Sequence, residues 1–295
     1  MHCSPAPGTP TAHTHWQAQA AAVGHTTVLR ALPTSAVQAV GPFVFLDHFG
    51  PAPSRAETLP AHPHAGIEVM TYLLEGANEH RDSKGHRGTV RSGGAQWMRA
   101  GSGILHAETV LPALGPTVHG LQLWARLPVA LQDSAPAYRG IDAEDVPTWV
   151  QDDCELRLLA GDLSARKGPI ELALPALMLH LLLPPGAQTR LVLPSQAHEY
   201  GLYGITADAG QLSLDDGIAL PRGGFVQLKS GTGSVRLHNA AAATHRAELF
   251  VLGGEPAPRP LVFGGPFVLD SHAALEQAQR RYFSGQMGRL DGVPN

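Results

Sequence analysis

Residues 62–74 read HPHAGIEVMTYLL, and residues 101–108 read GSGILHAE. In an extended strand, side chains two positions apart point to the same face, so His62 and His64 form one pair and His106 and Glu108 form a second. The apolar run at 67–74 has the length of a strand and follows a glycine. Two such pairs brought together inside a barrel would supply three imidazoles and one carboxylate.

The rest of the chain has the rhythm of an all-β protein. The 33 glycines and 25 prolines divide it into short apolar segments with turns every eight to twelve residues, which is typical of a barrel or sandwich. We expect strands at residues 43–47, 67–74, 88–91, 118–126, 155–159, 176–183, 188–193, 200–206, 225–229 and 247–252.

The length of 295 residues is enough for two cores, so we expect two domains. Residues 128–150 carry three prolines and little periodicity, which favours a linker with a short helical turn. Near the C-terminus, Ser271 is placed to cap a helix that contains Leu275, Ala278 and Tyr282. The predicted organisation is a flexible tail at 1–24, a metal-binding domain at 25–135, a linker at 136–150 and a second domain without metal at 151–290 that ends in the helix.

Composition and charge exclude several classes of function. The net charge of −4 and the pI of about 6.4 give no basic surface for nucleic acid and no polybasic membrane anchor. No apolar run reaches the length of a membrane span, and two distant cysteines form no disulfide framework, so a cytoplasmic location is expected. Only Lys84, Lys167 and Lys229 are lysines and alanine is abundant, which favours a bacterial source.

The four candidate ligands His62, His64, His106 and Glu108 leave open positions on an octahedral ion. This set suits Fe(II) and also permits Mn, Co, Ni, Cu or Zn. A closed structural zinc site more often uses cysteine, so open positions indicate catalysis or sensing. A chain with 16 histidines carries some HxH pairs by chance. His13 and His15 form such a pair in the predicted tail, and we do not interpret them as ligands.

Longer runs of the sequence resemble the pirin family. The resemblance rests on HPHAGIEVMTYLLEGANEHRDSKGHRG at 62–88, GGAQWMRAGSGILHAE at 93–108, GPFVFLDHFGP at 41–51, LQLWARLP at 121–128 and LGGEPAPRP at 252–260, and it covers most of residues 25–290. It implies two tandem cupin domains, which are jelly-roll β-barrels, with a metal in the first barrel only. It also implies that His62, His64, His106 and Glu108 are the ligands.

Glu68 has the same parity as the first histidine pair, so we expect it to face the same way. Many other cupins take their glutamate ligand from this place, whereas pirins take it from the second motif, so the resemblance assigns Glu68 to the surroundings of the metal or the cavity wall. The chain departs from the family at Ala65, Gly94 and Arg99. We expect these replacements to change the cavity mouth and its charge.

The resemblance implies a metal-dependent dioxygenase, similar to quercetin 2,3-dioxygenases, that opens a flavonol with O₂. Glu108 would then be a catalytic base as well as a ligand, Fe(II) the metal, and the protein a monomer. An alternative from the same family is a non-enzymatic, iron-dependent regulator that acts through a protein partner. The basic residues that could form the surface for this partner are Arg81, Lys84, Arg87, Arg91 and Arg99. The same residues are also typical of a solvent-exposed hairpin with no partner. A third possibility is an unidentified metabolite as substrate.

In the second half, His180, His198, His238 and His245 stand alone, with no HxH or His-x-Glu pair. Isolated histidines more often take part in packing or ordinary hydrogen bonds. We therefore expect no metal in the second barrel.

Overall fold

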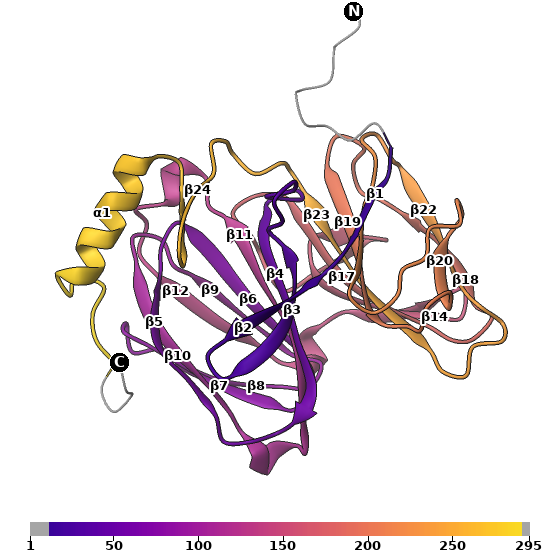
Figure 1. The fold of residues 1–295 in the computed structure, drawn as a ribbon, viewed down its shortest axis with the longest axis horizontal. Coiled ribbons are helices and arrows are strands. Elements are labelled where there is room, and N and C mark those ends of the chain that lie inside the picture. The colour runs from indigo at the N-terminus through magenta and orange to yellow at the C-terminus, as the bar shows by residue number, and fades with distance from the viewer. Residues whose placement is uncertain (1–11, 291–295) are drawn as a thin grey trace, which may run out of the picture.

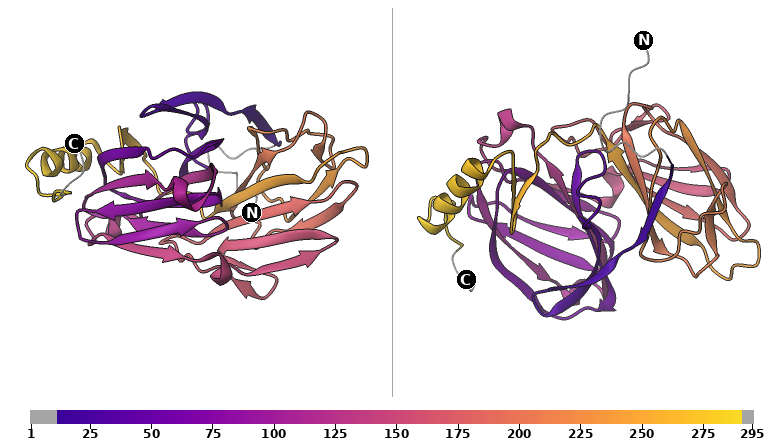
Figure 2. Two further views of the ribbon diagram at one scale, coloured as in Figure 1. Left: turned by 90° about the horizontal axis from the view of Figure 1, so that it is seen from below. Right: turned by 45° about the horizontal axis from the view of Figure 1, so that its top comes forward.

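A computed structural model describes residues 12–290 and shows two β-barrels side by side, each built from one large and one small antiparallel sheet (Figure 1). The all-β prediction and the tandem cupin architecture are confirmed. The single α-helix lies at the far end of the first barrel, away from the second (Figure 2).

The first barrel has a seven-stranded and a four-stranded sheet. The order of the large sheet is β12 (Ala137–Ile141), β9 (Ala95–Arg99), β6 (Ile67–Glu75), β11 (Thr117–Arg126), β4 (Phe43–Pro53), β3 (Thr26–Leu32) and β2 (Gln19–Val23). The order of the small sheet is β5 (Thr58–His64), β10 (Ile104–Val110), β7 (Ala77–Asp82) and β8 (Arg87–Arg91).

The second barrel has a seven-stranded and a three-stranded sheet. The order of the large sheet is β1 (Thr14–Gln17), β21 (Gly224–Gln227), β19 (Glu199–Thr206), β23 (Ala247–Gly254), β17 (Ala176–Leu183), β14 (Cys154–Ala160) and β13 (Thr148–Gln151). The small sheet is β18 (Gln188–Val192), β22 (Ser234–Asn239) and β20 (Leu212–Leu214). Hairpins β15 (Asp162–Leu163) with β16 (Arg166–Lys167) and β24 (Val262–Gly264) with β25 (Phe267–Leu269) complete the strands.

All ten strands predicted from the sequence are present, with ends shifted by a few residues. The short helical turn expected within 128–150 occurs twice, as 3₁₀ turns η2 (Val129–Leu131) and η3 (Ala143–Asp145), and a third turn is η1 (Pro112–Leu114). The predicted C-terminal helix is α1 (His272–Phe283), and the Ser271 hydroxyl caps it by accepting a hydrogen bond from the Ala274 N–H at 3.2 Å.

The two large sheets pack against each other and form a continuous apolar core between the barrels. Met70 and Tyr72 from the first barrel pack there with Tyr203, Phe225 and Phe250 from the second. In β6, even-numbered residues face this core and odd-numbered residues such as Val69 face the interior of the first barrel. The interface therefore fixes which side chains line the interior.

The expected flexible tail is wrong for residues 14–23, and residues 1–11 lie outside the described part. Strand β1 pairs with β21 of the second barrel, and β2 pairs with β3 of the first. Trp16 stacks on Phe225 with ring centroids 4.4 Å apart, and its Nε1–H donates to the Ala31 carbonyl. The composition of this segment suggested a tail, but pairing with a strand some 200 residues away orders it.

The linker expected at 136–150 is also wrong over most of its length. Strand β12 pairs with β9 and so belongs to the first barrel, while β13 pairs with β14 and belongs to the second. Here the chain passes from the first barrel to the second within the few residues from Ile141 to Thr148.

The sequence predicts that the C-terminal helix belongs to the second domain. This prediction is wrong, because the helix packs on the first barrel. Ala278 and Met287 pack with Ala65, Leu105 and Phe267. The Val268 N–H donates to the Ala65 carbonyl at 3.2 Å. Both ends of the described chain therefore contact a barrel other than the one that their sequence position suggested.

Candidate metal centre

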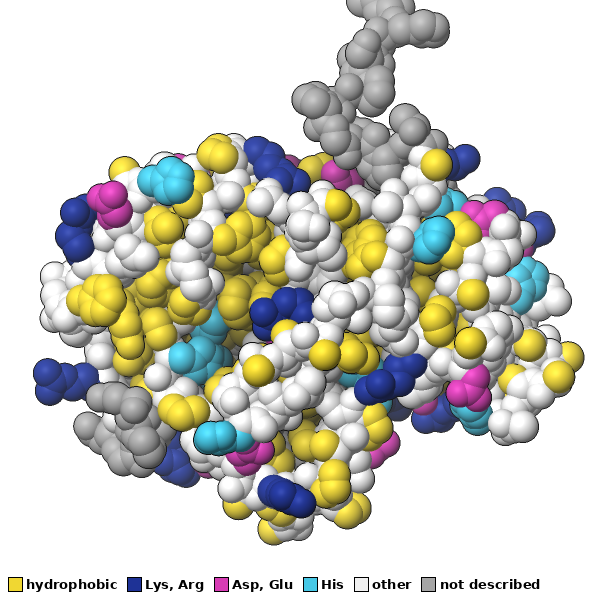
Figure 3. All heavy atoms as spheres, viewed as in Figure 1, with side chains coloured by type: hydrophobic (Ala, Val, Ile, Leu, Met, Phe, Trp, Pro, Cys, Tyr) yellow, Lys and Arg dark blue, Asp and Glu magenta, His cyan; other side chains and the backbone are white. Residues whose placement is uncertain are grey.

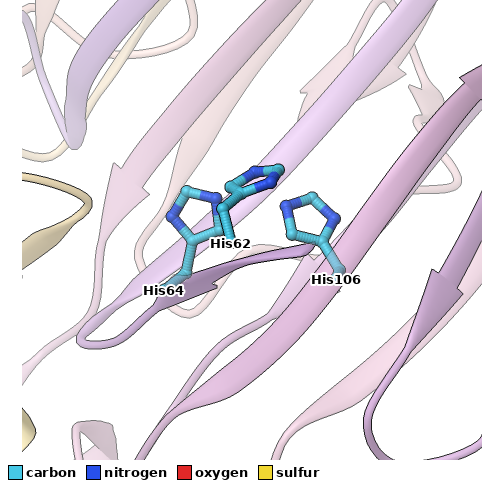
Figure 4. A group of neighbouring side chains, drawn as sticks. All are labelled: His62, His64 and His106. Atoms are coloured by element: carbon cyan, nitrogen blue, oxygen red, sulfur yellow. The ribbon is translucent and has the colours of Figure 1, made fainter. Parts of the chain in front are cut away.

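Strands β5 and β10 bring His62, His64 and His106 together inside the first barrel (Figure 4). His62 lies directly across from His106 in the pairing of these strands, and His64 follows His62 by two residues on the same face. One ligand atom from each ring lies within 4.8 Å of the others. This spacing lets one ion be shared with small side-chain adjustments, because metal–nitrogen bonds are about 2.1 Å long.

Each of the three rings has its Nδ1 engaged away from the shared centre. The Nδ1 of His62 lies 2.9 Å from the Pro60 carbonyl, that of His64 lies 3.1 Å from the Pro266 carbonyl, and that of His106 lies 3.4 Å from Nδ1 of His80. The Nε2 atoms of His64 and His106 are buried and have no hydrogen-bond partner. A buried orphan nitrogen is costly unless something binds it, so these residues fit a metal ion.

Burial also keeps these imidazoles neutral. Loss of solvation lowers the pKa of His64 and of His106 well below the ordinary value for histidine, and neighbouring histidines lower both further. The pKa of His62 is lowered by the same burial. Because only neutral imidazole binds a metal, the three candidate ligands are in the form that could bind one at neutral pH.

Glu108 lies outside the group of three histidines, within a cage of hydrogen-bond donors. Its Oε1 accepts from Gln96 at 2.6 Å, Asn78 at 3.0 Å and Thr71 at 3.3 Å. Its Oε2 accepts from Gln122 alone, at 3.0 Å. A carboxylate oxygen has about two lone-pair sites, so Oε2 keeps one for a metal or a proton. Its role as fourth ligand stays a prediction.

Glu108 also forms part of the wall of a cavity of about 250 Å³. Thr71, Asn78 and Gln122 share that wall with it, and apolar residues such as Val28, Phe49 and Leu59 form the rest. This volume lies near the lower end of small-molecule sites, and the mixture of an apolar lining with a few polar groups is typical of them. The cavity therefore suits a compact, largely apolar molecule.

The expectation that Glu68 faces the metal is wrong. Its Oε1 accepts from Trp97 Nε1 at 3.0 Å, and its Oε2 accepts from the Ala173 N–H of the second domain, also at 3.0 Å. Gly66 adopts φ +76°, and a Cβ there would lie 2.3 Å from the Val268 carbonyl. The turn at Gly66 ends β5 and starts β6, so parity counted from His64 does not carry across it.

The three departures from the family pattern do not line the cavity either, so that expectation is wrong as well. Ala65 is buried against the C-terminal segment. At Gly94 a Cβ would lie 2.7 Å from the Ile141 carbonyl, and Arg99 lies over the Trp97 ring, 5.9 Å from its centroid. These residues act on packing around the first barrel.

Several polar residues at the site were not singled out from the sequence. Strand β7 turns Asn78, His80 and Asp82 inward at i, i+2 and i+4, and all three are buried. This alternation of polar residues was the signal that could have found them. Gln96 and Gln122 stand alone in apolar strands and give no such signal.

The histidines of the second half lie apart from the three clustered histidines. His180 contacts Tyr72 and Glu248 at the interface between the barrels, and His238 pairs with Asp215 on the surface. Within residues 12–290, the group of three histidines is the one set of three or more potential ligands close enough to share an ion. It includes none of His13, His15 or the four histidines of the second half.

Two of the basic residues of the β7–β8 hairpin, Arg81 and Arg87, are paired within it. Arg81 and Arg87 both bind the Glu79 carboxylate, each with a contact of 2.8 Å. On the face drawn in Figure 3, acidic and basic side chains are scattered over both barrels rather than gathered in one patch. Among the described residues, no helix is long and apolar enough to cross a membrane.

The fold and the site define a bicupin whose first barrel carries a histidine cluster. Residues 25–125 match the pirin family and residues 178–288 match the pirin C-terminal cupin domain. A pirin-like protein of Solanum lycopersicum is 33% identical over 261 residues, which cover 88% of this chain and 87% of that protein. Human pirin is 31% identical over 252 residues, covering 85% and 84%. The chain belongs to the pirin family.

Solved structures give the same picture. A quercetin 2,3-dioxygenase from Acinetobacter baumannii superposes with a TM-score of 0.87 at 25% identity, covering 96% of this chain and 93% of that one. A second structure with that name from the same organism gives 0.84 at 28% identity, covering 93% and 97%.

Proposed function

We propose that the protein is a metal-dependent dioxygenase of the pirin type that opens a flavonol such as quercetin with O₂. The observation that carries the proposal is the convergence of three neutral imidazoles beside a caged carboxylate that lines a small cavity. The two bacterial structures named quercetin 2,3-dioxygenase support the choice of substrate class.

His62, His64 and His106 would hold the metal through Nε2, with Glu108 as the fourth ligand. A divalent ion held there would supply Lewis-acid chemistry that lowers the pKa of a hydroxyl group of the substrate. Fe(II) is our choice, because three histidines and one carboxylate with open positions suit it, while Mn, Co, Ni, Cu and Zn fit the same donors.

Glu108 is the proposed base. Its Oε1 is held by three donors and cannot turn without breaking them, so the one open site of Oε2 would hold either the metal or the proton of the flavonol 3-hydroxyl, one at a time. The apolar walls exclude water from the reacting ring. Both atoms of O₂ enter the substrate, the central ring opens to an ester, and one carbon leaves as carbon monoxide.

The test begins with protein purified anaerobically without a histidine tag. We expect about one metal per chain and metal-dependent loss of quercetin with matching O₂ uptake. Glu108→Gln should lower kcat by about 10²- to 10⁴-fold, the usual contribution of a general base. Glu171→Gln is the matched control, because Glu171 is exposed and pairs only with Lys167.

One bound metal without quercetin turnover would overturn the flavonol assignment. It would leave two alternatives, an iron-dependent regulator that binds a protein partner and an oxygenase for another small metabolite. The pairing of Arg81 and Arg87 with Glu79 leaves Lys84 and Arg91 as the exposed basic residues of that hairpin that could serve the regulator.

A further inference from the structure

His106 differs from the other two candidate ligands in what holds its Nδ1. His62 and His64 face backbone carbonyls, which only accept hydrogen bonds and so fix Nδ1–H in both rings. His106 faces a second imidazole, His80, with 3.4 Å between the two Nδ1 atoms. Either nitrogen of such a pair can be the donor, so the correct tautomer of His106 depends on what holds His80.

A buried carboxylate decides the direction of this hydrogen bond. The Nε2 of His80 lies 3.2 Å from Oδ2 of Asp82, and both side chains are fully buried. An ionised carboxylate only accepts, so His80 carries its proton on Nε2 and its Nδ1 accepts from His106. His106 then has Nδ1–H, and its Nε2 is free for the metal. In this arrangement each donor in the chain meets an acceptor.

Asp82 is itself held firmly. Its Oδ1 accepts from the backbone N–H groups of Lys84 at 2.8 Å and His86 at 3.0 Å, and its Oδ2 also accepts from Nδ1 of His86 at 2.8 Å. These contacts form the turn that follows β7, so the carboxylate cannot rotate away from His80.

The His80 ring is held from its face as well. Tyr138 stacks on it with centroids 4.2 Å apart and planes 9° from parallel. The Tyr138 hydroxyl donates to Gln96 at 3.3 Å, and Gln96 donates to Glu108. One tyrosine from β12 thus links the residues behind His106 to the cage around Glu108.

We propose that His80 and Asp82 are positioning residues that fix the tautomer and ring orientation of His106 and raise its basicity as a metal ligand. The inference rests on the metal site of the proposed function. It assigns a role to residues that do not touch the metal, since both ring nitrogens of His80 are engaged elsewhere. Substitution of a residue that hydrogen-bonds to a metal ligand typically weakens metal binding 10- to 100-fold.

The sharpest test is Asp82→Asn, with Co(II) as the probe metal and affinity measured by competition with a chromophoric chelator. The Asn oxygen can still accept from the backbone N–H groups of Lys84 and His86, which preserves the turn after β7. Its NH₂ group then faces Nε2 of His80 and forces that nitrogen to accept. The His80 proton moves to Nδ1, where it meets His106 Nδ1–H, so the hydrogen bond fails or His106 loses its free Nε2.

We expect Asp82→Asn to weaken Co(II) binding about 10- to 100-fold while the apoprotein unfolds at an unchanged temperature. Proton NMR of the Co(II) protein gives a second readout. The wild type should show a paramagnetically shifted, slowly exchanging Nδ1–H from His106, which the variant lacks. Asp215→Asn is the matched control, because Asp215 lies 2.6 Å from Nε2 of His238 on the second barrel.

If Asp82→Asn does not fold, His80→Asn and His80→Leu replace it. The Asn oxygen can stand where Nδ1 accepts from His106, so the Asn variant should bind Co(II) more tightly than the Leu variant. Equal affinities in that pair, or an Asp82→Asn affinity within about twofold of wild type, would overturn the inference alone. A wild-type protein that binds no Co(II) would overturn the metal site as well.

Discussion

The two barrels share an architecture but differ in what the small sheet turns inward. In the first barrel, β10 lies between two other strands and carries His106 and Glu108 on its inner face. In the second, β22 is the central strand and carries Val235 and Leu237, which pack with other leucines. The same kind of strand thus supports a polar site in one barrel and an apolar core in the other.

The difference shows what a polar interior requires. Around Glu108 and His106, the polar side chains pair with one another or with backbone carbonyls, because an unpaired buried polar group costs about 1–3 kcal/mol. The second barrel needs no such network, since apolar side chains gain free energy by burial alone. Under the proposed function, the first barrel would carry the reaction, and the second would contribute stability and the surface that supports the first.

The largest expected effect comes from breaking the site itself. His106→Ala removes one of three clustered ligands and should weaken metal binding by more than about 100-fold, beyond the effect of residues behind a ligand. Metal content per chain after gel filtration measures it. The barrel should stay folded, because apolar burial holds it.

His13→Ala and His198→Ala are the controls for this variant, since neither histidine belongs to the cluster. Equal metal content in all three variants would show that the ion binds elsewhere. Unfolding of the His106 variant, or of the wild type when its metal is removed, would mean that the site is structural.

The second barrel offers the complementary test, a substitution that should affect stability and not metal binding. Leu237→Ala removes a fully buried side chain from the leucine core and should lower the free energy of unfolding by about 2–5 kcal/mol. Metal content should not change. Urea unfolding followed by fluorescence, with metal analysis on the same sample, checks both. A loss of metal without a loss of stability would contradict the division of roles between the barrels.

Much of the fold was predictable because strands and turns leave local signals. The ten predicted strands are short runs between glycines and prolines, and the i, i+2 spacing placed His62 with His64 on one face and His106 with Glu108 on another. Strand β1 was not predictable, because its pairing with β21 depends on residues about 200 positions away.

Site residues were predictable only where they formed a local pattern. His62, His64 and His106 did, whereas Gln96 and Gln122 are single polar residues in apolar strands. The prediction for the orientation of Glu68 was wrong for a different reason. The turn at Gly66 interrupts the alternation of side chains on which the prediction relied. When a turn separates two residues into different strands, their spacing in the sequence no longer tells whether their side chains face the same way.

Glu68 provides the smallest and most selective test, because it can be compared with Glu108 in the same barrel. Glu108 accepts four side-chain hydrogen bonds, whereas Glu68 accepts two, one from each domain. Burial raises the pKa of Glu68 from 4.5 to about 7, against the opposing effects of hydrogen bonds from Ala173 and Trp97 and of the Arg99 charge.

The sign of the pH dependence follows from this raised pKa. Between pH 4.5 and 7 the unfolded chain has released the Glu68 proton and the folded chain still holds it, so raising the pH favours unfolding. The contribution is lost as the pH rises through about 7 and amounts to about 3 kcal/mol. Glu68→Gln, which cannot ionise, should remove this part of the slope between urea unfolding at pH 5 and at pH 8. A slope as steep as that of the wild type would mean that Glu68 is ionised in the folded protein, held by the same kind of donors that hold Glu108.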